Sequence, residues 1–131
     1  MVADGKTVHD WIRYYVPLVN EEFGLSDSNE WGITYFDNMI KYSDYIIDEK
    51  HYIWCICAKD MWGVPFMSVV SSYIKPEYRS VSSFRKMQDE IISLAKSKEV
   101  RYILQGSHLN EKLHKVLGMM GYRTSSMRRD I

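Results

Sequence analysis

Apolar residues at helical spacing define two segments in the first third of the chain. The first helix is predicted to begin after Thr7, because Asp10 follows three residues later as in a capping box, and to end at Gly24. A second helix is predicted to start near Ser28 or Asn29. The apolar positions of the two helices are Trp11, Ile12, Tyr15, Val16 and Val19, then Trp31, Tyr35, Phe36, Met39 and Ile40.

From residue 52 the pattern is typical of strands. The runs "YIWCICA" and "VPFMSVVSSYI" flank the turn "KDMWG", which predicts an antiparallel hairpin, and Lys75-Pro76 ends its second strand. Within the first strand, Cys55 and Cys57 face the same side, where a disulfide between them is disfavoured. We expect packed free thiols. Without a second pair of ligands to accompany the CxC spacing, we also expect no metal site.

The remaining segments alternate between helix and strand. The helix from Ser82 to about Lys98 is followed by the strand "VRYILQG", which a right-handed crossover sets parallel to the preceding strand. A fourth helix is predicted over 110–119, and "YRTSSMRRD" forms a last strand. The order is ααββαβαβ, so residues 1–131 are expected to form a single α/β domain with two N-terminal helices and a ββαβαβ mixed sheet.

Charge divides the chain into two unequal halves. Residues 1–74 carry 5 basic and 11 acidic residues, a net charge of −6, whereas residues 75–131 carry 12 basic and 6 acidic residues, a net charge of +6. This asymmetry predicts that the second half contacts an anion, or that the two halves attract each other or a partner. No basic run is interleaved with aromatics, so nucleic acid is the weaker prediction. With no apolar run of about 20 residues and no signal-peptide pattern at residues 1–11, we expect a cytoplasmic protein without a membrane partner.

The stretch "YIKPEYRSVSSFRKM", residues 73–87, joins strand-forming residues to a helix through an arginine and a serine-rich loop. A helix N-terminus presents unpaired N–H groups and a partial positive charge, which suits a pyrophosphate. The other interpretation is an ordinary strand-to-helix connection, capped by Ser82 or Ser83.

Two segments resemble the GNAT superfamily of N-acetyltransferases. The first, "YIKPEYR" at 73–79, is similar to the family's entry into its coenzyme A pyrophosphate loop. In the second, "NEKLHKVLGMMGY", Asn110 is followed eleven residues later by Gly121 and then by Tyr122, which is the family's spacing of asparagine, glycine and aromatic. The resemblance covers residues 52–131 in detail and implies a sheet whose two parallel strands splay apart.

The resemblance also implies acetyl-CoA as co-substrate and an amine as acceptor, with no metal. The backbone of Ser72 and Ile74 would bond the pantetheine amides, and Asn110 would contact the pantetheine arm. The amides of the loop and of the helix start would hold the pyrophosphate. These pyrophosphate residues are Arg79, Ser80, Val81, Ser82, Ser83 and Phe84.

The chain departs from the family pattern in the loop. Positions where the family has small residues, often glycine, carry Ser80, Ser82 and Phe84. Serine hydroxyls add donors for phosphate oxygens, whereas glycine permits a close backbone approach. The helical phase of Phe84 favours a core position over one that crowds the phosphate.

A second departure concerns the catalytic groups. Leu117 stands where the family's last helix often has a tyrosine that protonates the thiolate, and the strand before the loop has no acidic residue. The remaining acid and base candidates are His108, Tyr122 and Ser107. Alternatively, His108 is a loop histidine near the fourth helix and Tyr122 is a core aromatic.

These departures support a second hypothesis, a catalytically inactive module of the same fold that binds a protein partner. The short chain and altered loop resemble phage-encoded members of the fold, located in the host cytoplasm or the virion. Most aromatic residues of the first half fit a core, although they could line an acceptor pocket. Tyr42 and Tyr45 break the helical phase, so we expect them to be exposed, as at an interface such as that of a homo-oligomer.

Overall fold

The computed structural model describes residues 7–105 and the short strand at 128–130. Three helices and five strands form a mixed α/β fold. The helices are α1 (Val8–Glu22), α2 (Asn29–Met39) and α3 (Val81–Ser97), and the strands are β1 (Ser43–Ile47), β2 (His51–Lys59), β3 (Pro65–Ile74), β4 (Tyr102–Gln105) and β5 (Arg128–Asp130). Short 3₁₀ turns lie at Ser26–Ser28, Ile40–Tyr42 and Pro76–Tyr78.

The strands form one sheet in the order β1-β2-β3-β4-β5. The pairs β1–β2, β2–β3 and β4–β5 are antiparallel, and only β3–β4 is parallel. The predicted hairpin is therefore confirmed, and so is the parallel pairing of β3 with the strand that follows α3. The predicted fourth helix and most of the predicted last strand lie outside the described residues.

The first helix begins as its sequence predicts. The Thr7 side chain accepts from the Asp10 amide at 3.2 Å, and the Asp10 carboxylate accepts from the Thr7 amide at 3.1 Å. Gly24, which follows the helix, has a φ of +71°, a conformation that glycine adopts without steric cost. The predicted starts of α2 and α3 are each confirmed to within one residue.

The strand β1 was not predicted: the expected order ααββαβαβ has no strand between the second helix and the hairpin. Tyr45 in β1 is half-buried and stacks on Trp54 at 5.3 Å between ring centroids, so the expectation that Tyr45 is exposed is wrong. Tyr42 just before the strand is 70% exposed, as expected. The two tyrosines differ because Tyr42 ends a 3₁₀ turn, whereas pairing with β2 directs Tyr45 toward the core.

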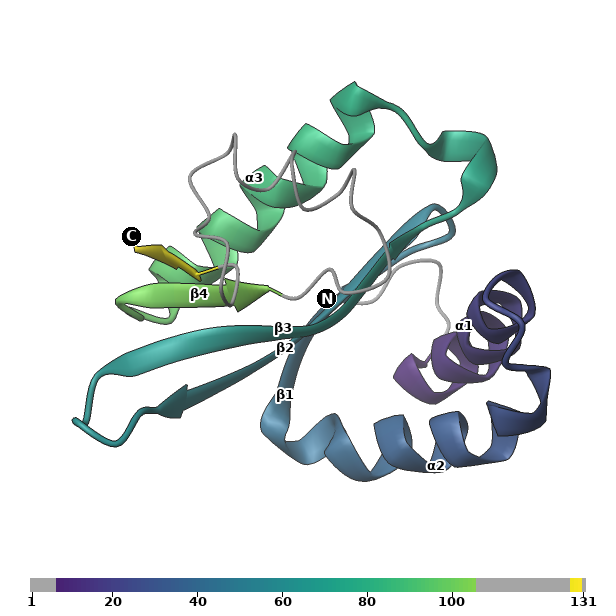
Figure 1. Ribbon diagram of the computed structural model, residues 1–131, viewed down its shortest axis with the longest axis horizontal. Coiled ribbons are helices and arrows are strands. Elements are labelled where there is room, and N and C mark those ends of the chain that lie inside the picture. Colours follow the sequence, from purple (N-terminus) through teal and green to yellow (C-terminus); the bar gives the residue numbers. More distant parts are fainter. Residues whose placement is uncertain (1–6, 106–127, 131) are drawn as a thin grey trace.

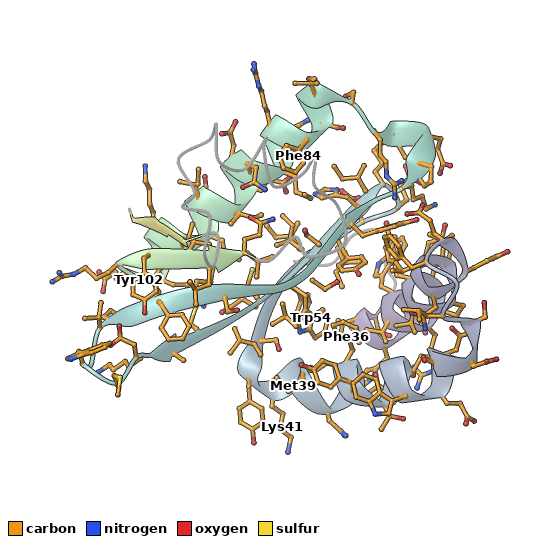
Figure 2. The ribbon with its side chains drawn as sticks, in the orientation of Figure 1. Phe36, Met39, Lys41, Trp54, Phe84 and Tyr102 are labelled. Atoms are coloured by element: carbon orange, nitrogen blue, oxygen red, sulfur yellow. The ribbon has the colours of Figure 1, made fainter. Side chains whose placement is uncertain are left out.

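The sheet separates two clusters of buried residues. Figure 1 shows α3 on one face and α1 with α2 on the other. Under α3 the buried side chains are mostly aliphatic, and Phe84 packs against them, as its helical phase predicts. Under α1 and α2 they are mostly aromatic: Phe36 meets Trp54 edge to face, with 5.0 Å between centroids (Figure 2). Most of the first-half aromatics therefore lie in the core, but Trp31 is 70% exposed.

Both cysteines are free, as predicted. Cys55 lies in the cluster under α3 and Cys57 packs against it, so the two face the same side of β2. Burial raises the pKa of the Cys55 thiol to about 12. This thiol is therefore a small core side chain rather than a nucleophile.

Candidate functional site

The predicted site lies where β3 ends and α3 begins. Ser80 is the N-cap of α3: its hydroxyl accepts from the Ser83 amide at 3.0 Å, and the Ser83 hydroxyl accepts from the Ser80 amide at 2.8 Å. The expectation that Ser82 or Ser83 caps the helix is therefore wrong. Ser80 holds this place because its backbone is extended, with φ −159° and ψ 168°, whereas Ser82 and Ser83 are already helical.

This capping box uses most of the amides that were predicted to hold pyrophosphate. The Arg79 amide donates to the Pro76 carbonyl at 3.2 Å, and the Phe84 amide donates to the Ser80 carbonyl at 3.0 Å. Among the described residues, only the amides of Val81 and Ser82 in this six-residue set have no hydrogen-bond partner. They stand at the positive end of a 17-residue helix, so they could still bind one anionic group.

Arg79 contacts three protein groups through its guanidinium. Its Nη2 donates to both carboxylate oxygens of Glu22, at 2.9 and 2.8 Å, and its Nε donates to the Ile74 carbonyl at 2.8 Å. The guanidinium also lies over the Tyr73 ring, 5.1 Å from its centroid. Arg79 thus ties the loop to the C-terminal end of α1.

Tyr73 completes this cluster. Its hydroxyl donates to Glu22 at 3.1 Å, and burial together with the Glu22 carboxylate raises the pKa of Tyr73 to about 12. An open cleft of about 280 Å³ lies beside it. The cleft is lined by Leu18, Glu21, Glu22, Tyr73, Lys75, Pro76 and Glu77.

In the part of the chain that the structure describes, one edge of β3 has no neighbouring strand in its C-terminal half, and we call it the open edge. The parallel pairing with β4 ends at Val69 and Gln105, whereas β3 continues to Ile74 beside β2 alone among the described strands. The Lys75 amide donates to the Lys50 carbonyl at 3.0 Å, which fixes the alternation of the antiparallel ladder. The N–H and C=O groups of Ser72 and Ile74 therefore point away from β2, and the Ile74 C=O accepts from Arg79 Nε.

A bulge permits this arrangement. Trp54 faces Ser71 and Cys55 faces Val69, so Val70 is an extra residue in β3. Ser72, after the bulge, again faces Ile53 and the α3 side of the sheet. The open edge leads from the end of β4 to the start of α3.

Of the other residues considered from the sequence, some lie at the ends of strands and the rest lie outside the described residues. His51 begins β2, where it contacts Asp48 at 3.1 Å and Glu90 at 3.0 Å, so it joins the β1–β2 turn to α3. Asp60 begins the β2–β3 turn as expected, accepting from the amides of Trp62 and Val64. The catalytic candidates His108 and Tyr122, together with Asn110, Ser107 and Leu117, lie outside the described residues.

Sequence reasoning missed three residues of this region. Glu22 fixes Arg79 from a distance of 57 positions, for which the sequence offers no signal. Gln88 and Gln105 are buried, 2% and 3% exposed, and Gln88 donates to Gln105 at 3.3 Å. Here a signal exists, because Gln88 lies in phase with the apolar face of α3.

The described residues were also compared with the requirements of a metal site and of a membrane-spanning helix. Across residues 7–105 and 128–130, no group of three or more His, Cys, Asp or Glu could hold a metal ion. In the same part of the chain, no helix is both long and apolar enough to cross a bilayer.

Comparison with solved structures shows an acetyltransferase-like fold. The chain is similar to a structure named "Putative acetyl transferase from Pyrococcus furiosus", with a TM-score of 0.75 and 12% sequence identity, covering 95% of this chain and 93% of that one. A structure named "Crystal structure of a probable acetyltransferase" gives a TM-score of 0.68 at 16% identity, covering 90% of this chain and 87% of that one.

A third structure, named "The crystal structure of a possible acetyltransferase from Clostridium difficile 630", gives a TM-score of 0.66 at 14% identity and covers 87% of this chain and 85% of that one. No family model and no curated protein matches the sequence. At these identities the likeness concerns the fold: a single mixed α/β domain with the architecture of these acetyltransferases.

Proposed function

We propose that the protein binds acetyl-CoA along the open edge of β3 and transfers the acetyl group to an amine. The observation that carries this proposal is the continuous path from the outward peptide groups of Ser72 and Ile74 to the N-terminus of α3. Peptide groups of this kind suit the amides of an extended pantetheine arm. The acetyltransferase-like fold supports the same ligand.

The pyrophosphate would lie against the first turn of α3. The amides of Val81 and Ser82 would donate to it, and the helix dipole would add favourable charge. In this proposal Ser80 and Ser83 fix the helix start through their mutual hydrogen bonds rather than binding phosphate directly. Arg79 holds the loop in place through Glu22.

The transfer needs an attacking amine and two proton movements. The amine nitrogen bonds to the thioester carbonyl carbon, the carbon–sulfur bond breaks, a base takes the ammonium proton and an acid protonates the departing thiolate. His108 is our candidate base and Tyr122 our candidate acid, with Asn110 contacting the pantetheine arm. The identity of the amine stays open.

Calorimetric titration tests the proposal. We expect acetyl-CoA to bind the purified protein at micromolar concentration, desulfo-CoA to bind comparably, and ATP, which lacks the pantetheine arm, to bind at least tenfold more weakly. Absence of binding at millimolar acetyl-CoA would contradict the proposal. With binding established, thiol release in the presence of candidate amines would identify the acceptor.

The capping box favours a second candidate function, a non-catalytic module that binds a protein partner. Four of the six predicted phosphate-binding amides already have protein partners, so the loop is a weaker anion site than a glycine-rich one. Under this proposal the chain does not bind acetyl-CoA, and its partner is recovered by pull-down. The resemblance to phage-encoded members, the cytoplasmic location and a homo-oligomeric state stay predictions.

A further inference from the structure

Two buried glutamines interrupt the otherwise apolar cluster under α3. Gln88 lies on the inner face of α3 and Gln105 ends β4, and they are the buried polar side chains within residues 7–105. Gln88 Nε2 donates to Gln105 Oε1 at 3.3 Å. This hydrogen bond fixes which end of the Gln105 carboxamide faces α3.

Among residues 7–105 and 128–130, the hydrogen bonding of Gln105 is limited to its contact with Gln88. Its Nε2 carries two N–H groups, and neither has a partner within the described part of the chain. Buried polar groups are as a rule hydrogen-bonded, so a buried donor without a partner among the described residues is a candidate contact for a ligand. Because Oε1 is already used by Gln88, the group that Gln105 still offers is a donor, which requires an acceptor oxygen.

Gln105 stands at the inner end of the open edge. It pairs with Val69, the last residue of β3 in the parallel ladder, and its side chain faces the same side as Ile103, toward α3. From Val69 to Ile74 the edge extends about 15 Å at ~3.3 Å per residue. The N-terminus of α3 lies at the far end of this edge, so a ligand anchored there by its phosphates reaches Gln105 with its other end.

We propose that Gln105 Nε2 donates a hydrogen bond to a carbonyl oxygen of the acylated pantetheine arm, and that Gln88 positions Gln105 for this contact. The inference rests on the proposed function and assigns a binding residue to its acyl end. A donor to the thioester carbonyl withdraws electron density from the carbonyl carbon, which favours attack by an amine.

The test compares acetyl-CoA with CoA, which lacks the acyl carbonyl, in calorimetric titrations of wild type and Gln105→Met. Methionine keeps the volume and removes both donors. We expect acetyl-CoA to bind Gln105→Met about tenfold more weakly than wild type, the loss of one hydrogen bond. Leu104→Met is the matched control, since Leu104 is adjacent in β4, half-buried, and directed to the other face.

The two ligands locate the contact. A larger loss for acetyl-CoA than for CoA supports the inference and assigns the acyl carbonyl, whereas equal losses support it and assign an amide carbonyl of the arm. Unchanged affinity for both ligands overturns the inference and leaves the proposed function intact. Failure of the wild type to bind either ligand overturns both.

Thermal unfolding without ligand separates binding from folding. We expect Gln105→Met to melt within a few degrees of wild type. If it unfolds, Gln105→Glu repeats the titration with a side chain of the same shape, which can still accept from Gln88 but lacks the two amide donors. Wild-type affinity in a folded Gln105→Glu variant would overturn the inference. Gln88→Leu is expected to weaken acetyl-CoA binding in the same direction by a smaller factor.

Discussion

The two faces of the sheet differ in how the buried polar groups of the described residues are hydrogen-bonded. Under α1 and α2, buried aromatic side chains donate to protein groups: Tyr15 donates to the Asp48 carbonyl at 2.6 Å and Trp54 donates to Ser43 at 3.0 Å. Under α3, the buried polar groups belong to Gln88 and Gln105, and the Gln105 donors have no partner in the described residues. Among the described residues, these aromatic groups of the first face are paired, whereas the Gln105 donors of the second face are not.

Figure 2 shows how the aromatic face is filled, with Phe36 and Trp54 close together between α2 and the sheet. Tyr52 also bonds Ser71, at 2.7 Å between the two oxygens. The open edge of β3 and the start of α3 belong to the other face. We infer that the aromatic face supplies stability and the α3 face supplies the site, and the following predictions test this division.

Trp54→Ala should give the largest loss of stability. Trp54 is 2% exposed and contacts aromatic rings on both sides, so its removal should lower the free energy of unfolding by about 3–5 kcal/mol. Urea denaturation measures the change. Trp31→Ala is the matched control, because Trp31 is 70% exposed and stacks only on Tyr35 among the aromatic pairs of the described residues, so its loss should stay below about 1 kcal/mol. Equal losses in the free energy of unfolding of the two variants would contradict the inference that the aromatic face supplies stability.

The aromatic face should also make the fold sensitive to alkali. Burial raises the pKa of Tyr52 to about 12 from an ordinary value of 10.0. A group whose pKa is raised in the folded state contributes stability that is fully present below its unfolded pKa and lost as pH rises through the folded pKa. The free energy of unfolding should therefore fall between about pH 10 and pH 12. Tyr52→Phe should flatten this decline, and an unchanged slope in that variant would exclude Tyr52 as its origin.

Arg79→Leu should have an intermediate effect because it separates the loop from α1. The variant loses three charge-assisted hydrogen bonds, but the Arg79 side chain is 44% exposed, so we expect a loss of about 1–2 kcal/mol in the free energy of unfolding, measured by urea denaturation. Arg85→Leu, an exposed arginine on the first turns of α3, should change stability by less than about 0.5 kcal/mol. Similar losses in the free energy of unfolding for the two variants would show that the contact between Arg79 and Glu22 does not stabilise the fold.

Ser80→Ala should have the smallest effect of the series, about 1 kcal/mol, because it removes the N-cap of α3. Ser82→Ala should be close to neutral, since Ser82 makes no side-chain hydrogen bond within the described residues. Thermal unfolding of both variants measures the difference. If Ser82→Ala is the more destabilising change, the cap has been assigned to the wrong serine.

Local signals made much of the fold predictable from the sequence. Thr7 and Asp10 lie within one turn of each other, so the start of α1 follows from adjacent residues. The strand β1 could not be predicted in this way, because "SDYII" directly follows helical residues and is stabilised by pairing with β2. Tyr45 is half-buried for the same long-range reason.

The site was less predictable than the fold. Three serines within four positions compete for the cap of α3, and the backbone angles at Ser80 decide among them. The contact between Arg79 and Glu22 joins positions 57 residues apart, so no local sequence pattern indicates it. Gln88, by contrast, could have been found as a polar residue in an apolar helical phase.

The central claim is that the open edge of β3 and the start of α3 bind acetyl-CoA, and amide NMR spectra recorded during a titration test it most directly. The account predicts that the amide signals of Ser72, Ile74, Val81 and Ser82 move on addition of acetyl-CoA. The amide of Tyr73, which faces β2, should move least within this stretch. Saturation with acetyl-CoA that leaves the four signals in place, or that moves Tyr73 as far as its neighbours, would contradict it.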